Sequence, residues 1–349
     1  MILDPILDVF RGKAVTIPPL DGAFRPNTRL DDAPVFAELT EPDNLLSSGD
    51  RLLASSGNAI HALAAGSEPV VVDTFQSPVT ALALSPSGEL TVGLESGTLL
   101  IAGREVSLPA AIRCITALAY ADDGTLWLAN GSDRHAPSEW AADLMKKGAS
   151  GSLWARMQGG DFRKVAGDIA FPYGLHPVGG DVLVSESWRH QLVRFNTAGH
   201  RTTVLAHLPG YPARLSPAGD GGAWLTLFAP RNRLIEFVLQ ETHYRQDMIE
   251  QVPPAFWIAP ALSSSRSFLE PLQCGGIRTM GIHKPWSPSR SYGLVVKLDQ
   301  AMQPQFSLHS RANGTRHGIC SVRENDGQLF IASKGGDCVL AVDLASGGF

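Results

Sequence analysis

The sequence predicts an all-β chain folded as a six-bladed β-propeller with helical insertions between blades. Three observations predict it: abundant turn residues, a hairpin pattern that recurs six times, and a spacing close to one blade. The chain has 349 residues, 44% hydrophobic and 18% charged, which is enough apolar sequence for a large core. Gly and Pro, at 35 and 24 residues, form about a sixth of it and indicate many tight turns between short strands.

The repeat is a glycine turn, an apolar strand, a short polar break and a second apolar strand. Its six turn glycines are Gly49, Gly88, Gly124, Gly180, Gly222 and Gly327. Successive glycines lie 39, 36, 56, 42 and 105 residues apart. A four-stranded blade takes roughly 40–50 residues, so three spacings fit a blade and two carry insertions. A pair of β-sandwiches is the alternative, but sandwiches need no blade-length repeat.

Residues 35–349 are therefore expected to form the propeller, and residues 1–34 an N-terminal extension packed on it. The first insertion, near 134–150, is expected to hold a short helix that Ser138 can cap. The second insertion, 240–292, is expected to begin with a helix in ETHYRQDMIEQV that a Pro-Pro pair stops, and to continue as a long lid. The segment RNRLIEF just before it is assigned to the second strand of the fifth hairpin.

Composition also bounds the partners and the compartment. The formal charge is −5 and no Lys/Arg-rich block occurs, so neither nucleic acid nor an acidic membrane surface is expected as a partner. No apolar stretch approaches the roughly 18 residues of a membrane span, and Asp4 and Asp8 interrupt the apolar start where a secretory signal would lie. The four cysteines are scattered, without a CxxC pair, which predicts a cytoplasmic protein with reduced thiols. The oligomeric state is left open.

The stretches GDIAFPYGLHPVGGDVLVSESWRHQLVRF and LPGYPARLSPAGDGGAWLTL resemble the strictosidine synthase-like proteins, within the senescence marker protein/gluconolactonase superfamily. The family's usual motifs there are FPNG, ET..HRI.RY and LPG.PDNI....DG..W. The closing ICSVRENDGQLFIAS resembles the family's last blade, and the match spans about 35–345. The resemblance implies a propeller with a small-molecule pocket at one mouth of its central tunnel. Superfamily hydrolases hold a divalent metal there, usually calcium.

Motif by motif, the family's metal ligands fall on unusual residues of this chain. The early acidic ligand corresponds to Asp43, and the later ones fall on Thr116, Tyr173 and Arg214. Calcium takes six to eight oxygen ligands, several of them carboxylate or carbonyl. No cofactor is therefore expected, and Arg214 is expected to replace the charge of the metal and to pair with Asp43. The alternatives are a metal held by Asp43 with carbonyl oxygens and Glu41, and an Arg214 that only caps a strand end.

Alkaloid-forming members of the family use a glutamate in the last blade for an amine–aldehyde condensation. The matching position here is Cys320, which argues against that reaction. Cys320 is either a nucleophile with a lowered pKa or, more commonly for such a residue, a small buried side chain.

Further candidates lie at the blade edges. His283, in the second insertion, resembles a lid histidine of the family and is a candidate general base, or else an exposed loop residue. His190 and Glu186 are candidate substrate-binding residues, with a blade-rim contact as the alternative for His190. Three tryptophans at equivalent positions of the repeat are expected in the core between blades: Trp127, Trp188 and Trp224.

These observations favour a small-molecule enzyme that hydrolyses a lactone or ester. Asp43 or His283 would activate water, and Arg214 with Tyr173 would stabilise the oxyanion. Thr116, Cys320, Glu186 and His190 would contact the substrate, which is expected to be anionic. Two other classes remain open: a non-catalytic propeller that binds an acidic metabolite, and a scaffold that docks proteins on its outer face.

Overall fold

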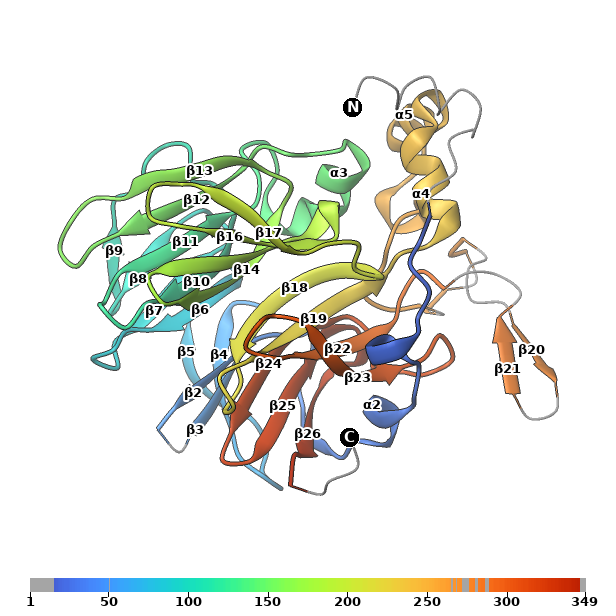
Figure 1. Ribbon diagram of the computed structural model, residues 1–349, viewed down its shortest axis with the longest axis horizontal. Coiled ribbons are helices and arrows are strands. Elements are labelled where there is room, and N and C mark those ends of the chain that lie inside the picture. The colour runs from blue at the N-terminus through green and yellow to red at the C-terminus, as the bar shows by residue number, and fades with distance from the viewer. Residues whose placement is uncertain are drawn as a thin grey trace.

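The structure is a computed structural model that describes residues 16–49, 51–264, 266–267, 269–271, 276–279, 282–285 and 289–345. Within these residues, six four-stranded antiparallel sheets form the blades of a propeller (Figure 1). The predicted six-bladed propeller is confirmed.

The first three blades follow chain order from the innermost strand outward. Blade 1 contains β2 (Pro42–Ser48), β3 (Arg51–Ser56), β4 (Ala59–Leu63) and β5 (Val70–Thr74). Blade 2 contains β6 (Val79–Leu84), β7 (Leu90–Leu94), β8 (Leu99–Ile101) and β9 (Arg104–Val106). Blade 3 contains β10 (Ile115–Tyr120), β11 (Leu126–Asn130), β12 (Gly151–Arg156) and β13 (Arg163–Ile169).

Blade 4 follows the same order, whereas blades 5 and 6 depart from it. Blade 4 contains β14 (Pro172–Val178), β15 (Asp181–Glu186), β16 (Gln191–Phe195) and β17 (Arg201–Leu205). Blade 5 contains β18 (Gly210–Pro217), β19 (Ala223–Pro230), β22 (Gly293–Leu298) and β23 (Pro304–Ser310). Blade 6 contains β24 (Ile319–Asn325), β25 (Gln328–Ser333), β26 (Cys338–Asp343) and β1 (Val35–Glu38).

The turn glycines of the repeat all lie between the first and second strands of a blade. Five of the six take a left-handed backbone, for example Gly88 at φ 84° and Gly124 at φ 83°. Glycine reaches this region without steric cost, which explains its recurrence at these turns. In blade 5 the left-handed residue is Gly221 rather than Gly222.

Blade 6 closes the ring because it takes strands from both ends of the described chain. β1 pairs with β26, with Ala37 opposite Val339 and Glu38 opposite Cys338. The 3₁₀ turn η1 (Gly22–Phe24) and helix α2 (Arg29–Asp32), which precede β1, pack against β23 of blade 5. Ser310 Oγ donates a hydrogen bond to Asp31 Oδ1 at 2.6 Å there.

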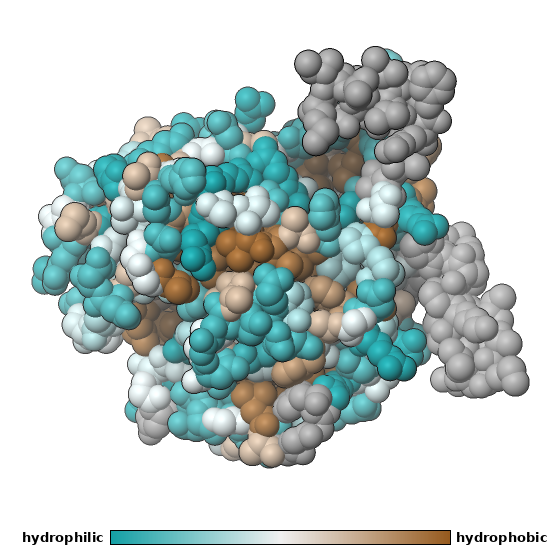
Figure 2. Space-filling model, in the orientation of Figure 1, coloured by the Kyte–Doolittle hydropathy of each residue, from teal (hydrophilic) through white to brown (hydrophobic). Residues whose placement is uncertain are grey.

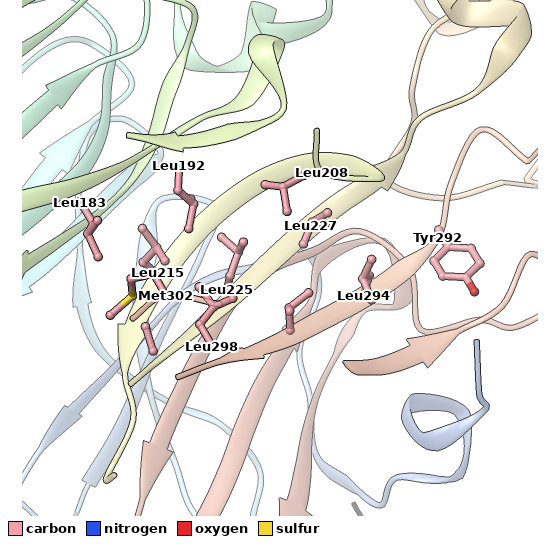
Figure 3. Packing of buried hydrophobic residues seen from close by; sticks show 12 residues of the cluster. Leu183, Leu192, Leu208, Leu215, Leu225, Leu227, Tyr292, Leu294, Leu298 and Met302 are labelled. Atoms are coloured by element: carbon pink, nitrogen blue, oxygen red, sulfur yellow. The ribbon is translucent and has the colours of Figure 1, made fainter. Parts of the chain in front are cut away.

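Hydrophobic residues fill the spaces between adjacent blades. Figure 3 shows one such cluster, in which Leu183 and Leu192 of blade 4 face Leu215, Leu225 and residues of β22 in blade 5. Equivalent clusters join the other blades, and Trp127 and Trp224 are buried in two of them, as expected. Trp188 differs: it lies in the 3₁₀ turn η3 (Ser187–Arg189) and belongs to a separate cluster under the helices. The prediction that the three tryptophans are equivalent is therefore wrong for Trp188.

The helical insertions lie between strands of blades 3 and 5. The first holds the 3₁₀ turn η2 (Pro137–Glu139) and α3 (Trp140–Met145). The second holds α4 (Arg233–Gln240), α5 (Thr242–Gln251), the 3₁₀ turn η4 (Pro254–Phe256) and a hairpin of β20 (Gly276–Thr279) and β21 (Ile282–Pro285). Figure 1 shows α4 and α5 standing beyond the end of blade 5. The predicted helix in ETHYRQDMIEQV is confirmed as α5.

The strand assignment of RNRLIEF is wrong, because this segment begins α4. The side chain of Asn232 accepts hydrogen bonds from the N–H groups of Leu234 and Ile235, at 2.8 and 3.4 Å, and so caps a helix. The second-strand partner in blade 5 is β22, which follows the insertion. Ser138 does not cap α3 either: the cap position is Glu139.

The visible face of the molecule is mainly hydrophilic, with hydrophobic residues gathered near its middle (Figure 2). None of the helices in the described ranges combines the length and the hydropathy of a membrane span.

Candidate functional site

A cavity of about 410 Å³ opens at one mouth of the central tunnel. Residues of five innermost strands form its floor, and loops and insertions form its rim. Its lining residues are Glu41, Asp43, Gly57, Pro78, Val79, Thr80, Glu95, Thr116, Pro137, Ser138, Trp140, Phe171, Tyr173, Arg214, Phe228, Leu262 and Lys334. The structure therefore brings Asp43, Thr116, Tyr173 and Arg214 together, as the sequence predicts.

The guanidinium of Arg214 lies on the tunnel axis, where backbone carbonyls of several blades converge. Its Nη1 is 2.5 Å from Asp43 Oδ1 and also approaches the carbonyl oxygens of Asp43 and Cys320, at 3.4 and 3.5 Å. Its Nη2 donates to the carbonyl oxygen of Thr80 at 2.7 Å and approaches that of Thr116 at 3.5 Å. One buried cation thus binds oxygens from four innermost strands, and Arg214 pairs with Asp43 as expected.

Lys334 completes an ion triad with Asp43 and Arg214. Its Nζ donates to Asp43 Oδ2 at 2.8 Å, so each carboxylate oxygen of Asp43 contacts a different cation. Burial alone would raise the pKa of Asp43, but the two cations outweigh burial and lower this pKa to about 2. Burial alone would lower the pKa of Lys334, but Asp43 raises it well above its usual value. The triad therefore carries a net charge of +1 at neutral pH.

Thr116 and Tyr173 complete the floor. Thr116 Oγ1 donates to the carbonyl oxygen of Pro172 at 2.5 Å, which ties blade 3 to blade 4. The Tyr173 ring centroid lies 4.9 Å from the guanidinium carbon of Arg214, a cation–π contact. Burial raises the pKa of Tyr173 far above neutral, so its hydroxyl stays protonated.

An aromatic wall rises above the floor on one side. Phe228 makes edge contacts with Trp140 and Tyr173, with ring centroids 5.3 and 5.9 Å apart. Trp140 belongs to α3, and the buried carboxylate of Asp143 on the same helix fixes this helix to its neighbours. Asp143 accepts hydrogen bonds from Trp188 Nε1 at 2.8 Å and Ser132 Oγ at 2.7 Å. The wall is therefore held by the first insertion and gives the cavity an apolar side.

Two carboxylates lie at the rim. Glu95 Oε1 accepts hydrogen bonds from the hydroxyl and the backbone N–H of Ser138, at 2.6 and 3.0 Å, so it joins blade 2 to the first insertion. The carboxylate of Glu41 has no hydrogen-bond or ion-pair partner among the described residues. Glu41 also has a left-handed backbone, at φ 47°, which is uncommon for a non-glycine residue.

Cys320 lies beneath the floor and does not line the cavity. Burial raises the pKa of its thiol to about 12, so the thiolate needed of a nucleophile is not formed at neutral pH. Its Sγ contacts the carbonyl oxygens of Pro42 and Asp43, at 3.4 and 3.3 Å. Of the two interpretations given above, the small buried residue fits this geometry.

Glu186 and His190 do not line this cavity. The Glu186 carboxylate accepts hydrogen bonds from the N–H of Ala170 at 2.8 Å and from Gln191 at 2.6 Å, and it pairs with Arg189 and Arg201. His190 contacts the carbonyl oxygen of Gly210 at 3.1 Å, and burial lowers its pKa to about 3. Both side chains thus join structural elements. The side chain of His283 lies outside the described part of the chain.

Lys334 was not predicted as a site residue from the sequence, although the blade repeat indicates its position. It follows β25, the second strand of blade 6, as Gly57 and Glu95 follow the second strands of blades 1 and 2. All three positions line the cavity. An alignment of the blades on this polar break would have placed Lys334 at the mouth.

Within the described ranges, no three His, Cys, Asp or Glu side chains gather as a set of metal ligands. The oxygens that converge on the tunnel axis are one carboxylate and several backbone carbonyls, and the guanidinium of Arg214 fills the place where they meet. A calcium ion would need that place and more oxygen ligands. The residues present do not fit a metal while Arg214 holds this position.

No family model matches the chain, and no curated protein matches its sequence. Solved structures do resemble it. A candidate gluconolactonase superposes with a TM-score of 0.55 at 13% identity, over 89% of this chain and 91% of its own. A gluconolactonase from Xanthomonas campestris superposes with a TM-score of 0.53 at 14% identity, over 87% and 86% of the two chains. At such identities the likeness shows the propeller fold.

Proposed function

We propose that this chain is a lactonase-type propeller that hydrolyses a small cyclic ester in the tunnel-mouth cavity without a metal ion. The observation that carries the proposal is Lys334, a cation at the cavity floor. An ammonium has three donor hydrogens, and Asp43 takes one of them in the described structure. The likeness to two proteins described as gluconolactonases supports the choice of a lactone as substrate.

Lys334 would stabilise the negative charge that develops on the ester carbonyl oxygen. The described carboxylate best suited to activate water is Glu41, because its oxygens are not engaged. In this step the water oxygen attacks the carbonyl carbon, Glu41 takes the proton, and the ring C–O bond breaks. The leaving alkoxide then receives the proton from Glu41, which balances the hydrolysis.

Asp43 and Arg214 have supporting roles in this mechanism. The sequence had instead predicted that Asp43 activates water and that Arg214 stabilises the oxyanion. With a pKa near 2 and a cation on each oxygen, Asp43 is a weak base at neutral pH. Both terminal nitrogens of Arg214 already bind Asp43 and backbone carbonyls. The pair would therefore position Lys334 and hold the charge that a metal supplies in the resembled family.

A test compares hydrolysis of five- and six-membered sugar lactones by the wild type, K334M and E41Q. Loss of the cation or of the base should lower kcat/KM by roughly 10²-fold or more. K164M, which removes an exposed lysine on the outer strand β13, is the matched control and should keep full activity. Activity should also survive exhaustive dialysis against a chelator. Unchanged hydrolysis in both K334M and E41Q would refute the mechanism.

A second function, non-catalytic binding of an acidic metabolite, is favoured by one observation. The described cavity lining contains no histidine, and its deepest carboxylate is neutralised by two cations. A net positive floor beside an aromatic wall suits a small organic anion with an apolar ring. Saturable binding of such an acid without turnover of any lactone would favour this function.

A further inference from the structure

A second cavity, of about 370 Å³, occupies the opposite mouth of the central tunnel. The later residues of all six innermost strands line it, whereas the first cavity is lined by residues at or near their starts. Arg214 lines both cavities, so its guanidinium and Asp43 separate them. The second cavity is thus a distinct compartment with its own residues.

Arg323, on β24, is the cation that belongs to this second cavity. Its Nε donates to Ser47 Oγ at 3.2 Å, across the seam between blades 6 and 1. Its two terminal nitrogens have no hydrogen-bond or ion-pair partner among the described residues. A guanidinium stays charged even where burial lowers its pKa, as burial does here. A partly buried cation without a counter-ion is costly unless an anion binds it.

The neighbouring acidic residues do not neutralise Arg323. Glu324 is turned away: its carboxylate accepts hydrogen bonds from the backbone N–H of Gly219 at 3.1 Å and from Trp224 Nε1 at 2.6 Å. Asp122, at the rim of the cavity, is exposed and forms no described ion pair. The ion triad on the tunnel axis, which separates the two cavities, adds a further net positive charge at the inner end of the second cavity.

Three other polar side chains around the cavity can donate hydrogen bonds. Ser47 Oγ accepts from Arg323, and Ser321 Oγ accepts from the N–H of Leu45 at 3.0 Å, so each hydroxyl hydrogen remains to be donated. His176 also lines the cavity and has no described partner. Burial lowers its pKa to about 4, so its neutral ring offers one N–H at pH 7.

We propose that this second cavity binds a small phosphate-bearing molecule, with the Arg323 guanidinium and the Ser47 and Ser321 hydroxyls holding the phosphate group. A planar guanidinium can donate two parallel hydrogen bonds to phosphate oxygens, and hydroxyls can satisfy the remaining ones. The cavity is larger than a phosphate ion, which leaves room for the organic part of the ligand. This site is separate from the proposed lactone site and does not depend on it.

Calorimetric titration with inorganic phosphate at constant ionic strength tests the site. The wild type should bind one phosphate saturably, and R323Q should weaken binding by at least roughly tenfold because it removes the charged fork. R323K, which keeps the charge but loses the fork, should bind with intermediate affinity. S47A should weaken binding less than R323Q. K334M, which removes one charge of the ion triad on the side of the first cavity, should weaken phosphate binding less than R323Q does.

The outcomes separate the two cavities. Unfolding curves must first show that each variant is folded, and S47A still tests the site if R323Q is not. The proposal would be overturned if the wild type did not bind phosphate saturably. It would also be overturned if R323Q bound phosphate as tightly as S47A. Binding that is kept in R323Q and lost in K334M would assign the anion to the first cavity and would overturn it as well.

Discussion

At the residue scale, the most informative side chain is Arg214. It is buried, yet its charge is balanced by Asp43 and by carbonyl oxygens of β2, β6, β10 and β24. Carbonyls at the ends of strands from different blades converge only on the tunnel axis, and a cation placed there ties those blades together. One substitution in this triad should therefore affect stability and the site at once.

Removing the carboxylate of Asp43 should destabilise the fold, because D43N leaves two cations without their shared counter-ion. Breaking a buried ion pair in this way costs about 3–5 kcal/mol. Urea unfolding at pH 7 measures the loss. D133N, which breaks an exposed ion pair with Arg134, is the matched control and should cost less than about 1 kcal/mol. Equal effects of the two variants would contradict the buried triad.

The same carboxylate predicts a pH dependence. The folded-state pKa of Asp43, about 2, lies below its usual value of 3.8. Its stabilising contribution is therefore complete above pH 4 and is lost as the pH falls towards 2. The difference in unfolding free energy between the wild type and D43N should shrink over this range. A difference that stays constant from pH 5 to pH 2.5 would exclude a lowered pKa.

At the element scale, the innermost strands set the width of the tunnel. β14 approaches β18 so closely that a Cβ on Gly174 would lie 2.3 Å from the carbonyl oxygen of Ala213 and 2.8 Å from the Cα of Arg214. Only a residue without a side chain fits such an approach. This glycine therefore determines where β18 presents Arg214 to the tunnel.

G174A should push β18 away from β14, destabilise the fold by about 1–3 kcal/mol and displace Arg214 from Asp43. Urea unfolding and the proposed lactone hydrolysis both report on the change, and both should fall. G160A is the control, since the nearest atom to its Cβ would be 3.5 Å away, at ordinary contact distance. Wild-type stability in G174A would show that the two strands can separate freely.

The insertions show why element type was harder to predict in one place. RNRLIEF has the apolar content of a strand and occupies the place of a strand in the repeat, yet it forms the start of α4. Its cap residue, Asn232, and the spacing of the buried Ile235 and Val238 favour a helix. The repeat pattern outweighed this local signal because β22, the strand that fills the place in blade 5, lies about 60 residues further along the chain.

At the scale of the whole molecule, the ring is closed by β1, which comes from the opposite end of the propeller sequence to its partner β26. Ala37 faces the core between blades 6 and 1, and Val35 on the same strand is more exposed. Closure packs the last blade against the first across this hydrophobic core.

A37D should therefore open the seam, because it buries an unpaired carboxylate where β1 packs on blade 1. We expect a loss of more than about 3 kcal/mol in unfolding free energy, measured by urea denaturation. V35D introduces the same charge on the exposed side of β1 and should cost less than about 1 kcal/mol. If the two variants unfolded alike, β1 would not be part of the closed ring.

The sequence by itself determined the blade count and the turns, because each blade is a local hairpin repeat with its own glycine signal. Motif order also indicated that Asp43, Thr116, Tyr173 and Arg214 meet at one mouth, and the structure places them there. Only the tertiary structure showed that Lys334 joins Asp43 and that Glu186 and His190 bind structural partners. It also showed that the terminal nitrogens of Arg323 have no partner among the described residues. These distinctions depend on which strands converge on the tunnel and which way each side chain turns. Ring closure decides both, by bringing together residues up to about 290 positions apart.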